Sequence, residues 1–404
     1  MTNICNSADQ LAIVNAAKMS LDSSLLAEEF LYEKYRLRRN VLSNKVEFRL
    51  IEQPDSLYRP LTQEALSSII LRSRREGFEG ELDIVSDLKL LVASEDIPAF
   101  DPAKDWLEGL EWDGKDRIAA FWQRIPGISV EQTYFLSIWM RSMVAHWLGV
   151  DDEHGNECVP TFIGAQGCGK STFCIRMLPK MLRSYYMDNF NLGNKNDKNM
   201  ALSDSLLICL DEMDQYKPGQ QAELKQALSK TTVNGRKIYG RTHENRPRRA
   251  SFVGTTNNKR PLQDATGSRR YLCILIPDGL LIDNITELDY EQIYAQLVNE
   301  VKEKERFWFT NEETCRIQEL NAPFMQVHGL EKMVEFCIRP ANEDEKESFL
   351  TTTQIAAEVL KLFPSEKKAG VSNTKVGLAM KALGYEKLHG RNGNYYSAVL
   401  INKE

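Results

Sequence analysis

Short apolar runs alternate with helical patterns between residues 158 and 276, and this alternation is the main structural signal of the chain. The runs are typical of buried strands, which we expect at Val159–Ile163, Leu206–Leu210, Ala250–Gly254 and Tyr271–Ile276. Apolar positions at helical spacing predict helices over Lys170–Leu182 and Gln220–Ser229. Strands that alternate with helices are typical of a parallel α/β sheet. We therefore expect an α/β domain in the middle of the chain.

The patterns on either side predict further elements. Helices are expected over Thr62–Arg75, Arg117–Arg124, Val130–Leu148 and Glu287–Trp308, and a strand over residues 46–50. The aromatic stripe of the Val130–Leu148 helix predicts core packing. The chain then divides into a mostly helical N-terminal accessory region (1–95), a helical lead-in (96–150), the α/β domain (151–310), a connector (311–350) and a C-terminal domain (351–404).

The C-terminal domain predicts two helices, Thr353–Leu362 and Asn373–Leu383, followed by a hairpin around Arg391. This order resembles a winged helix, a common DNA-binding module. Lys375 and Lys381 on the second helix and Arg391 at the hairpin are the candidate DNA contacts. A protein-interaction or lid domain is the alternative, because winged helices serve both purposes.

A glycine-rich loop follows the first strand of the α/β domain, and it matches G-x-x-x-x-G-K-[ST] in full. Its glycines let successive backbone N–H groups face a phosphate, and the helix that follows points its positive end at the anion. Lys170 can reach the β- and γ-phosphates, and Ser171 can place its hydroxyl on Mg²⁺. The expected nucleotide-binding residues are Gly164, Gly167, Gly169, Lys170, Ser171 and Thr172, with ATP and Mg²⁺ as ligands.

Polar residues end the next two strands of the expected sheet. Asp211 and Glu212 follow Leu206–Leu210 about 40 residues after the loop. Asp211 would hold Mg²⁺, and Glu212 would take a proton from the attacking water. Asn257, after the strand that begins at Ala250, could orient that water. An ordinary strand end or Asn turn is the alternative for these positions.

Arginines supply two further candidates. Arg269 and Arg270 precede the last strand and are suited to stabilising charge on a transferring phosphoryl group, in many cases from a neighbouring subunit. Residues 236–249 hold six Lys or Arg and one acid, with glycines and a proline that favour a loop or hairpin. Arg236, Lys237 and Arg241 are the candidate contacts to a nucleic-acid backbone. A surface pair and a solvated charge run are the respective alternatives.

Composition limits the class of protein. The 404 residues are 42% hydrophobic and 27% charged, which is typical of a globular protein, and the formal net charge is −6. Nucleic-acid binding would therefore need a local basic patch. Eight cysteines form no C-x-x-C pair, which argues against structural zinc and disulfides and favours reduced thiols in a cytoplasm. We find no signal sequence and no apolar run long enough for a membrane helix.

The motifs in this order resemble the virulence-associated protein E family, whose members are ATPase and helicase-like proteins of phages and mobile elements. The resemblance covers about residues 100–310 and includes LEGLEWDGKDRI, GAQGCGKST, LLICLDE, SFVGTTNN and DATGSRRY. It implies a P-loop AAA+ core similar to superfamily 3 helicases, with Lys170 and Ser171 in Walker A and Asp211 and Glu212 in Walker B. It also places Asn257 in sensor 1 and Arg269 and Arg270 at the arginine finger.

Two functions remain open from these residues. The first is an oligomeric ATPase, expected as a hexameric ring, that translocates on single-stranded or forked DNA during replication. The second is an ATP-gated switch that binds or remodels a protein without unwinding DNA. The basic segment between Walker B and sensor 1 favours the first, because the superfamily places its central-channel DNA loop there.

Overall fold

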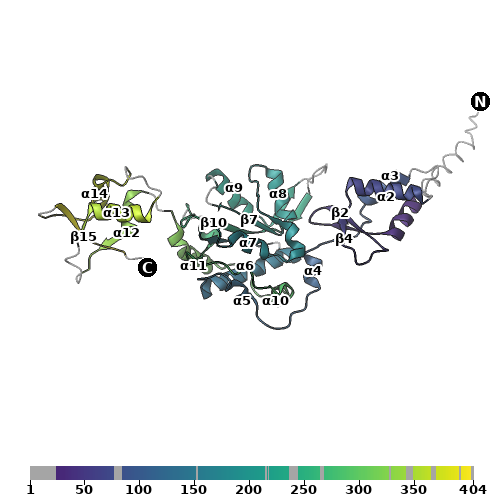
Figure 1. Cartoon of the computed structure of the whole chain (residues 1–404), viewed down its shortest axis with the longest axis horizontal. Helices are drawn as coiled ribbons and strands as arrows, with labels where there is room; N and C mark the ends of the chain where they lie inside the picture. The colour runs from purple at the N-terminus through teal and green to yellow at the C-terminus, as the bar shows by residue number, and fades with distance from the viewer. Residues whose placement is uncertain are drawn as a thin grey trace, which may run out of the picture. The chain divides into compact units, whose positions relative to one another are not determined.

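The computed structural model describes residues 24–76, 84–151, 153–213, 216, 218–235, 244–263, 268–326, 329–342, 349–364, 370–390 and 393–401. The chain forms two compact units, Met1–Pro323 and Phe324–Glu404. Figure 1 labels their helices and strands, and each unit is described by itself.

The N-terminal part of the first unit has a helix over residues 24–34, followed by a four-stranded sheet in the order β3-β2-β1-β4. Its side chains alternate, so that Tyr35, Leu37, Val46 and Phe48 are buried against helices on one face. Figure 1 shows these helices above the sheet. The strands are β1 (Tyr35–Asn40), β2 (Lys45–Leu50), β3 (Arg59–Pro60) and β4 (Ala99–Phe100), and the helices are α2 (Gln63–Arg75) and α3 (Ile84–Ala93).

Helices remain the larger part of the regular structure described in residues 24–95, and this sheet adds strands to the expected mostly helical region. The strand over residues 46–50 and the helix over Thr62–Arg75 are confirmed. The sequence pattern does not predict β1, because arginines occupy three of its six positions, among the buried residues Tyr35, Leu37 and Asn40. Antiparallel pairing with β2 places Arg36 and Arg38 on the face opposite Tyr35 and Leu37. Arg39 donates instead to the carbonyls of Val92 and Ser94.

A five-stranded parallel sheet forms the centre of the first unit, in the order β11-β5-β10-β7-β6. All four strands expected in the middle of the chain are confirmed; the two-residue edge strand is additional. The bounds are β5 (Val159–Ile163), β6 (Tyr186–Met187), β7 (Leu207–Leu210), β10 (Ser251–Thr256) and β11 (Tyr271–Leu275). The expected mixed α/β class with a parallel sheet is thus confirmed.

Helices flank this sheet. Helix α6 (Val130–Leu148) has the predicted bounds; Ser129 caps its start, and Gly149 ends it with φ of 71°. Its Trp139 and Trp147 are fully buried, which confirms the predicted core stripe. Helix α7 (Lys170–Arg176) is shorter than predicted because Pro179 cannot continue it. A 3₁₀ segment η1 (Lys180–Tyr185) and the helices α8 (Lys195–Asp204) and α9 (Pro218–Leu228) follow.

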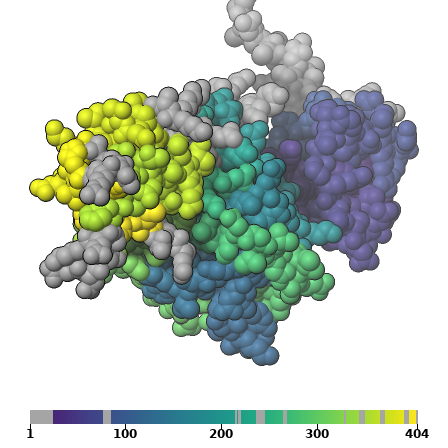
Figure 2. Space-filling view, turned by 60° about the vertical axis from the view of Figure 1, so that its left-hand side comes forward, coloured from purple at the N-terminus to yellow at the C-terminus, as the bar shows by residue number. Residues whose placement is uncertain are grey.

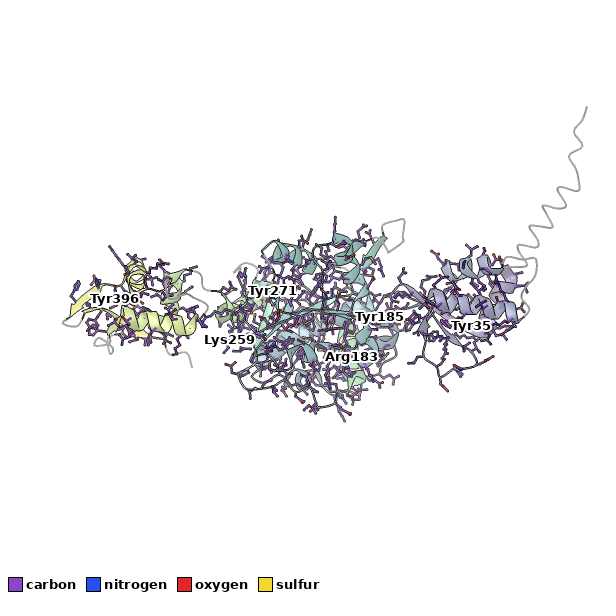
Figure 3. All side chains as sticks on the ribbon, turned by 45° about the horizontal axis from the view of Figure 1, so that its top comes forward. Tyr35, Arg183, Tyr185, Lys259, Tyr271 and Tyr396 are labelled. Carbon is purple, nitrogen blue, oxygen red and sulfur yellow. The ribbon has the colours of Figure 1, made fainter. Side chains whose placement is uncertain are left out.

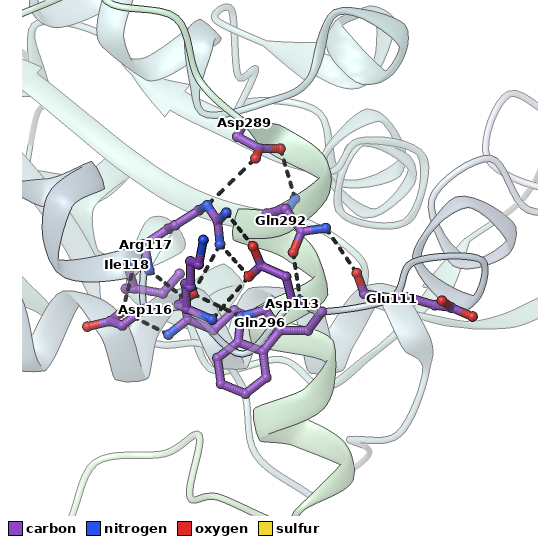
Figure 4. Close-up of polar contacts among 10 residues, drawn as sticks. Glu111, Asp113, Asp116, Arg117, Ile118, Asp289, Gln292 and Gln296 are labelled. Carbon is purple, nitrogen blue, oxygen red and sulfur yellow. Dashed lines mark hydrogen bonds and ion pairs between the residues drawn. The ribbon is translucent and has the colours of Figure 1, made fainter.

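The lead-in packs on helix α10 (Tyr290–Lys302) through the polar contacts drawn in Figure 4. Gln292 accepts from the Asp113 N–H at 2.9 Å and donates to the Glu111 carbonyl at 3.0 Å. Gln296 accepts from the Arg117 N–H at 2.8 Å. The segment LEGLEWDGKDRI, residues 107–118, therefore holds the lead-in against α10. The short helices on its two sides are α4 (Lys104–Glu108) and α5 (Ile118–Trp122).

The expected connector is divided between the two units. Helix α11 (Asn311–Asn321) lies in the first unit, and η4 (Ala322–Phe324) spans the boundary. Helix α12 (Leu330–Cys337) lies in the second unit and contributes Met333, Val334 and Cys337 to its core. The sequence does not predict this helix as a separate element, because its short amphipathic pattern is followed by a charged run typical of a linker.

The second unit combines three helices with a small antiparallel sheet in which β15 pairs with β12, β13 and β14. The two predicted helices and the hairpin strands are confirmed. Figure 3 labels Tyr396, a buried residue of the central strand. The elements are β12 (Ile338–Pro340), β13 (Phe349–Thr351), α13 (Thr352–Leu362), α14 (Asn373–Ala382), β14 (Lys387–Gly390) and β15 (Gly393–Leu400). No helix within the described ranges is long and apolar enough to cross a bilayer.

Candidate functional site

The candidate site lies where three neighbouring parallel strands end. β10 pairs with β5 on one side, with Thr256 opposite Ile163, and with β7 on the other, with Gly254 opposite Leu210. The glycine-rich loop follows β5, the two acids follow β7, and Asn257 follows β10. Because the strands are parallel, their carboxyl ends share one edge, which is where α/β sheets bind ligands.

The glycine-rich loop has the backbone conformation that its glycines allow. Gly167 and Gly169 have φ of 82° and 94°, values that other residues rarely adopt. Lys170, the first residue of α7, is only 8% exposed. Its ammonium donates to the carbonyls of Gly164 at 2.7 Å and Ala165 at 2.9 Å. The loop thus curls around the lysine ammonium.

Asn257 completes the contacts of this lysine. Its Oδ1 lies 2.9 Å from Lys170 Nζ, so the ammonium has three oxygen acceptors. The side chain from the end of β10 therefore orients the lysine directly. The sequence suggested a role for Asn257 with water; this lysine contact was not expected.

The two acids line the same cavity as the loop. Asp211 accepts a hydrogen bond from the Thr255 hydroxyl. Glu212 has φ of 48°, an unfavourable conformation for a side chain of this kind. Strained backbone of this type occurs at functional sites. The cavity has a volume of about 300 Å³ and is lined by Gln166, Gly167, Gly169, Lys170, Ser171, Thr172, Asp211, Glu212, Thr255, Thr256 and Asn257.

A second hollow adjoins the two acids. Asp211, Glu212, Tyr216 and Gln220 line its volume of about 320 Å³. Burial raises the pKa of Tyr216, with Cys209 and Asp211 adding to the effect, so its phenol stays protonated at neutral pH. Both acids thus line two hollows.

The oxygen atoms of this cavity suit a magnesium ion. Mg²⁺ prefers oxygen ligands and is held by one or two carboxylates together with phosphate oxygens and water. Ser171 supplies a hydroxyl and Asp211 a carboxylate to one cavity. Among the described residues, no group of three or more His, Cys, Asp or Glu could hold a metal ion. The donor set therefore fits an ion that takes most of its ligands from a bound nucleotide.

A segment after β11 supports the loop from behind, and we call residues 277–286 the strap. The Ile282 N–H donates to the Cys168 carbonyl at 3.0 Å, and Asn284 Nδ2 donates to the Gly169 carbonyl at 3.0 Å. In a trans peptide the N–H points opposite to the C=O. Two successive loop N–H groups, of Gly169 and Lys170, therefore point away from the strap.

Other contacts hold the strap itself. Arg124 donates to the carbonyls of Asp283 at 2.9 Å and Thr286 at 2.6 Å. Neither Asn284 nor Arg124 was a candidate from the sequence. No local signal marks them, because each acts on a segment far away in the chain.

Arg269 and Arg270 lie at the amino end of the parallel strands, opposite the end that holds the cavity. They end the 3₁₀ segment η3 (Ser268–Arg270), directly before β11, and Tyr271 pairs with Val159 at the start of β5. Val159 lies four residues before Ile163, the last residue of β5 before the loop. The distance along the strand is about 13 Å. Arg270 lies 3.9 Å from Glu157, and Arg269 is exposed. Figure 3 labels Tyr271, the residue that follows the pair in the sequence. The structure does not bring these arginines into their own chain's cavity.

The basic segment is flanked by paired strands, as its composition predicted. β8 (Thr232–Gly235) and β9 (Glu244–Pro247) are antiparallel. Arg236, Lys237 and Arg241 fall between them, outside the described residues. The expected DNA candidates Lys375 and Lys381 are exposed on α14, and Arg391 also lies outside the described residues.

The other three cations of the basic segment have structural contacts. Arg246 pairs with Asp204 at 2.6 Å and donates to the Val41 carbonyl. Arg248 is buried among backbone carbonyls, including those of Lys230 and Asn156. Burial lowers its pKa to about 10. Arg249 pairs with Asp101 at 2.7 Å. Half of the basic run therefore stabilises the fold.

Comparisons with known proteins give one family and several distant structures. Three solved chains described as apo structures of the NrS-1 C-terminal region share 10%, 11% and 12% identity with this chain. The alignments cover 93%, 94% and 94% of this chain and 99%, 100% and 99% of those chains, with TM-scores of 0.42, 0.43 and 0.45. No curated protein matches. The model of the virulence-associated protein E-like domain matches residues 107–326. This match spans more than half of the chain and includes every element of the cavity, so the chain belongs to the virulence-associated protein E-like family.

Proposed function

We propose that this chain is a Mg²⁺-dependent ATPase with a P-loop core of the AAA+ type. The observation that carries the proposal is the convergence of Lys170, Ser171, Asp211, Glu212 and Asn257 on one cavity of about 300 Å³. These residues come from three strand ends of one parallel sheet. Family membership supports a place in the replication of a phage or mobile element.

Each residue has a role that its position suits. The loop N–H groups and Lys170 bind the phosphates, and Ser171 and Asp211 hold the ion. Mg²⁺ bound there would bridge the phosphate oxygens and neutralise charge that develops on them. Glu212 takes a proton from the attacking water. Asn257 keeps the Lys170 ammonium in place and can also form a hydrogen bond to that water through its amide group.

Arg269 and Arg270 require a second subunit in this mechanism. They lie at the amino end of the strands, and the phosphate-binding loop of the same chain lies at the carboxyl end, about 13 Å away along β5. In a ring, the amino end would face the nucleotide of the next subunit. The ring would be a hexamer that acts on single-stranded or forked DNA. Residues 236–241 would contact the DNA in its channel, which explains why an acidic chain has a local basic segment. The winged-helix-like second unit would add a DNA contact through Lys375, Lys381 and Arg391.

ATP hydrolysis by purified full-length protein, with and without single-stranded DNA, tests the proposal. Lys170→Ala should abolish hydrolysis, while Lys180→Ala, a matched change of an exposed lysine in η1, should leave it unchanged. Hydrolysis that persists in Lys170→Ala would contradict the ATPase assignment. Hydrolysis without DNA stimulation and without salt-sensitive DNA binding would instead favour the ATP-gated protein switch.

A further inference from the structure

The N-terminal sheet has an outer face that lacks a covering helix. Tyr35, Leu37 and their partners on β2 pack on α2 and α3, so the alternate residues point the other way. Figure 1 shows the helices on one side of this sheet only. The pairs of β1 and β2 on this face are Arg36 with Arg49, Arg38 with Glu47, and Asn40 with Lys45. Asn40 is buried and donates to the Tyr185 hydroxyl at 2.6 Å, so the open part of the face ends before it.

This outer face is strongly basic. Its six residues on β1 and β2 include four cations and one acid, in a chain whose net charge is −6. The acid, Glu47, is already engaged: it accepts from Arg38 at 2.8 Å and from Asn40 at 2.8 Å. Within the described ranges, Arg36, Lys45 and Arg49 form no ion pair with a carboxylate.

The pairing of Arg36 with Arg49 is unfavourable by itself. Like charges directly opposite each other on antiparallel strands destabilise a sheet. Arg38 lies two residues along β1, about 7 Å further, and its charge is paired with Glu47 at 2.7 Å. An anion bound between Arg36 and Arg49 would reduce their repulsion. The arrangement therefore costs stability in the free protein and favours a negatively charged ligand.

The guanidinium groups are held in place before any ligand binds. Arg38 is stacked between the rings of Phe100 at 3.4 Å and Tyr58 at 3.9 Å. Arg49 lies 5.0 Å from the Tyr58 ring and donates to the Pro54 carbonyl, and Arg36 donates to the Tyr32 carbonyl at 3.1 Å. Each guanidinium retains further N–H donors. Ordered side chains lose less conformational entropy on binding than free ones.

We propose that this face, formed by Arg36, Arg38, Lys45 and Arg49, binds the phosphate backbone of a single-stranded nucleic acid. A row of cations across two strands matches a polyanion, and backbone contact needs no base readout. None of these four residues lines the ATP cavity. The face would hold the strand independently of ATP hydrolysis and so goes beyond the proposed motor.

The test measures binding of a fluorescent single-stranded oligonucleotide to the full-length protein, without nucleotide, over a series of salt concentrations. Arg36→Gln/Arg49→Gln should lower the log–log salt slope by about 1.4, since each single-strand phosphate contact contributes about 0.7. That slope corresponds to roughly 25-fold weaker binding at 0.1 M salt. Arg75→Gln/Lys89→Gln, with the same charge change on exposed positions of α2 and α3, should bind as the wild type does.

Two further measurements keep the outcome clear. Arg36→Lys/Arg49→Lys retains both charges and should retain the slope. Melting temperatures at or above the wild-type value show that the variants are folded, since removing the like-charge pair should not destabilise the sheet. Unchanged affinity and slope in Arg36→Gln/Arg49→Gln would overturn the proposal. Equal displacement of the oligonucleotide by polyglutamate at the same charge concentration would assign the face to an acidic protein and also overturn it. Both readouts are independent of ATP hydrolysis, so failure of the ATPase proposal would be seen separately.

Discussion

The ammonium of Lys170 lies 2.9 Å from the amide oxygen of Asn257, a residue 87 positions further along the chain. The contact joins the loop after β5 to the end of the adjacent strand β10. It gives the lysine a third oxygen acceptor besides two loop carbonyls. A phosphate that enters the cavity would meet an ammonium already fixed by the sheet.

Glu212→Gln should separate nucleotide binding from hydrolysis. The change keeps the shape of the side chain but removes the base, so ATP should bind normally and turn over slower by a factor of about 10² or more. Single-turnover hydrolysis and equilibrium binding measure the two steps. Glu291→Gln, at an exposed position of α10, is the control and should be normal. Hydrolysis at the normal rate in Glu212→Gln would show that another group is the base.

The two loop glycines should differ in their tolerance of a methyl group. Both have positive φ, so alanine at either costs about 1–2 kcal/mol. A Cβ on Gly169 would lie 2.5 Å from Asn284 Nδ2, whereas a Cβ on Gly167 meets nothing within 4 Å. Gly169→Ala must therefore also displace the strap amide and lose its hydrogen bond, at about 1 kcal/mol more. Denaturant unfolding without nucleotide measures the difference; equal losses would exclude a role for the strap.

Mixed oligomers should reveal whether the arginine pair acts between subunits. Neither Arg269→Ala/Arg270→Ala nor Lys170→Ala protein should hydrolyse ATP alone. Mixing them should restore part of the activity, because some interfaces then join an intact loop to an intact arginine pair. Hydrolysis is measured alongside sedimentation. Full wild-type activity at concentrations where only monomer sediments would contradict the arrangement.

Acid should destabilise the first unit through His146. This residue is 1% exposed on α6, and burial lowers its pKa, with the Arg248 charge adding to the effect and Asp151 opposing it. The unfolded chain, with a His pKa of about 6.5, then binds more protons than the folded one. The free energy of unfolding should therefore fall as pH drops below about 6.5. His146→Gln should flatten this dependence in denaturant titrations between pH 7.5 and 5; an unchanged slope would exclude His146.

The channel segment should control how DNA affects hydrolysis. Changing Arg236, Lys237 and Arg241 to Ala should remove DNA stimulation and lower the salt slope of single-strand binding by about 0.7 per lost contact. Basal ATP turnover should persist, since these residues are not expected to touch nucleotide. Changing Lys375, Lys381 and Arg391 should weaken binding without uncoupling hydrolysis. Unchanged affinity and slope in the first variant would refute the channel role.

Much of the cavity could be predicted because its signals are local. The glycine-rich loop, the acids at the end of β7 and the strands β5, β7, β10 and β11 each depend on neighbouring residues, and these strands are confirmed. Helix α6 has its predicted bounds because its cap and apolar stripe lie within the helix. The sequence pattern does not predict strand β1, because Arg36 and Arg38 belong to a second face that exists only once β1 pairs with β2.

The sequence by itself determined which residues could carry phosphate chemistry, and the tertiary structure decided which of them meet. The parallel pairing of β5 with β10 brings Asn257 to Lys170. The pairing of β11 with β5 places Arg269 and Arg270 at the amino end of the strands, away from the cavity. Folding also engages Arg246 and Arg249 in ion pairs. The physical reason is that strand order and register arise from burial of distant apolar faces against one another, which no local pattern of residues contains.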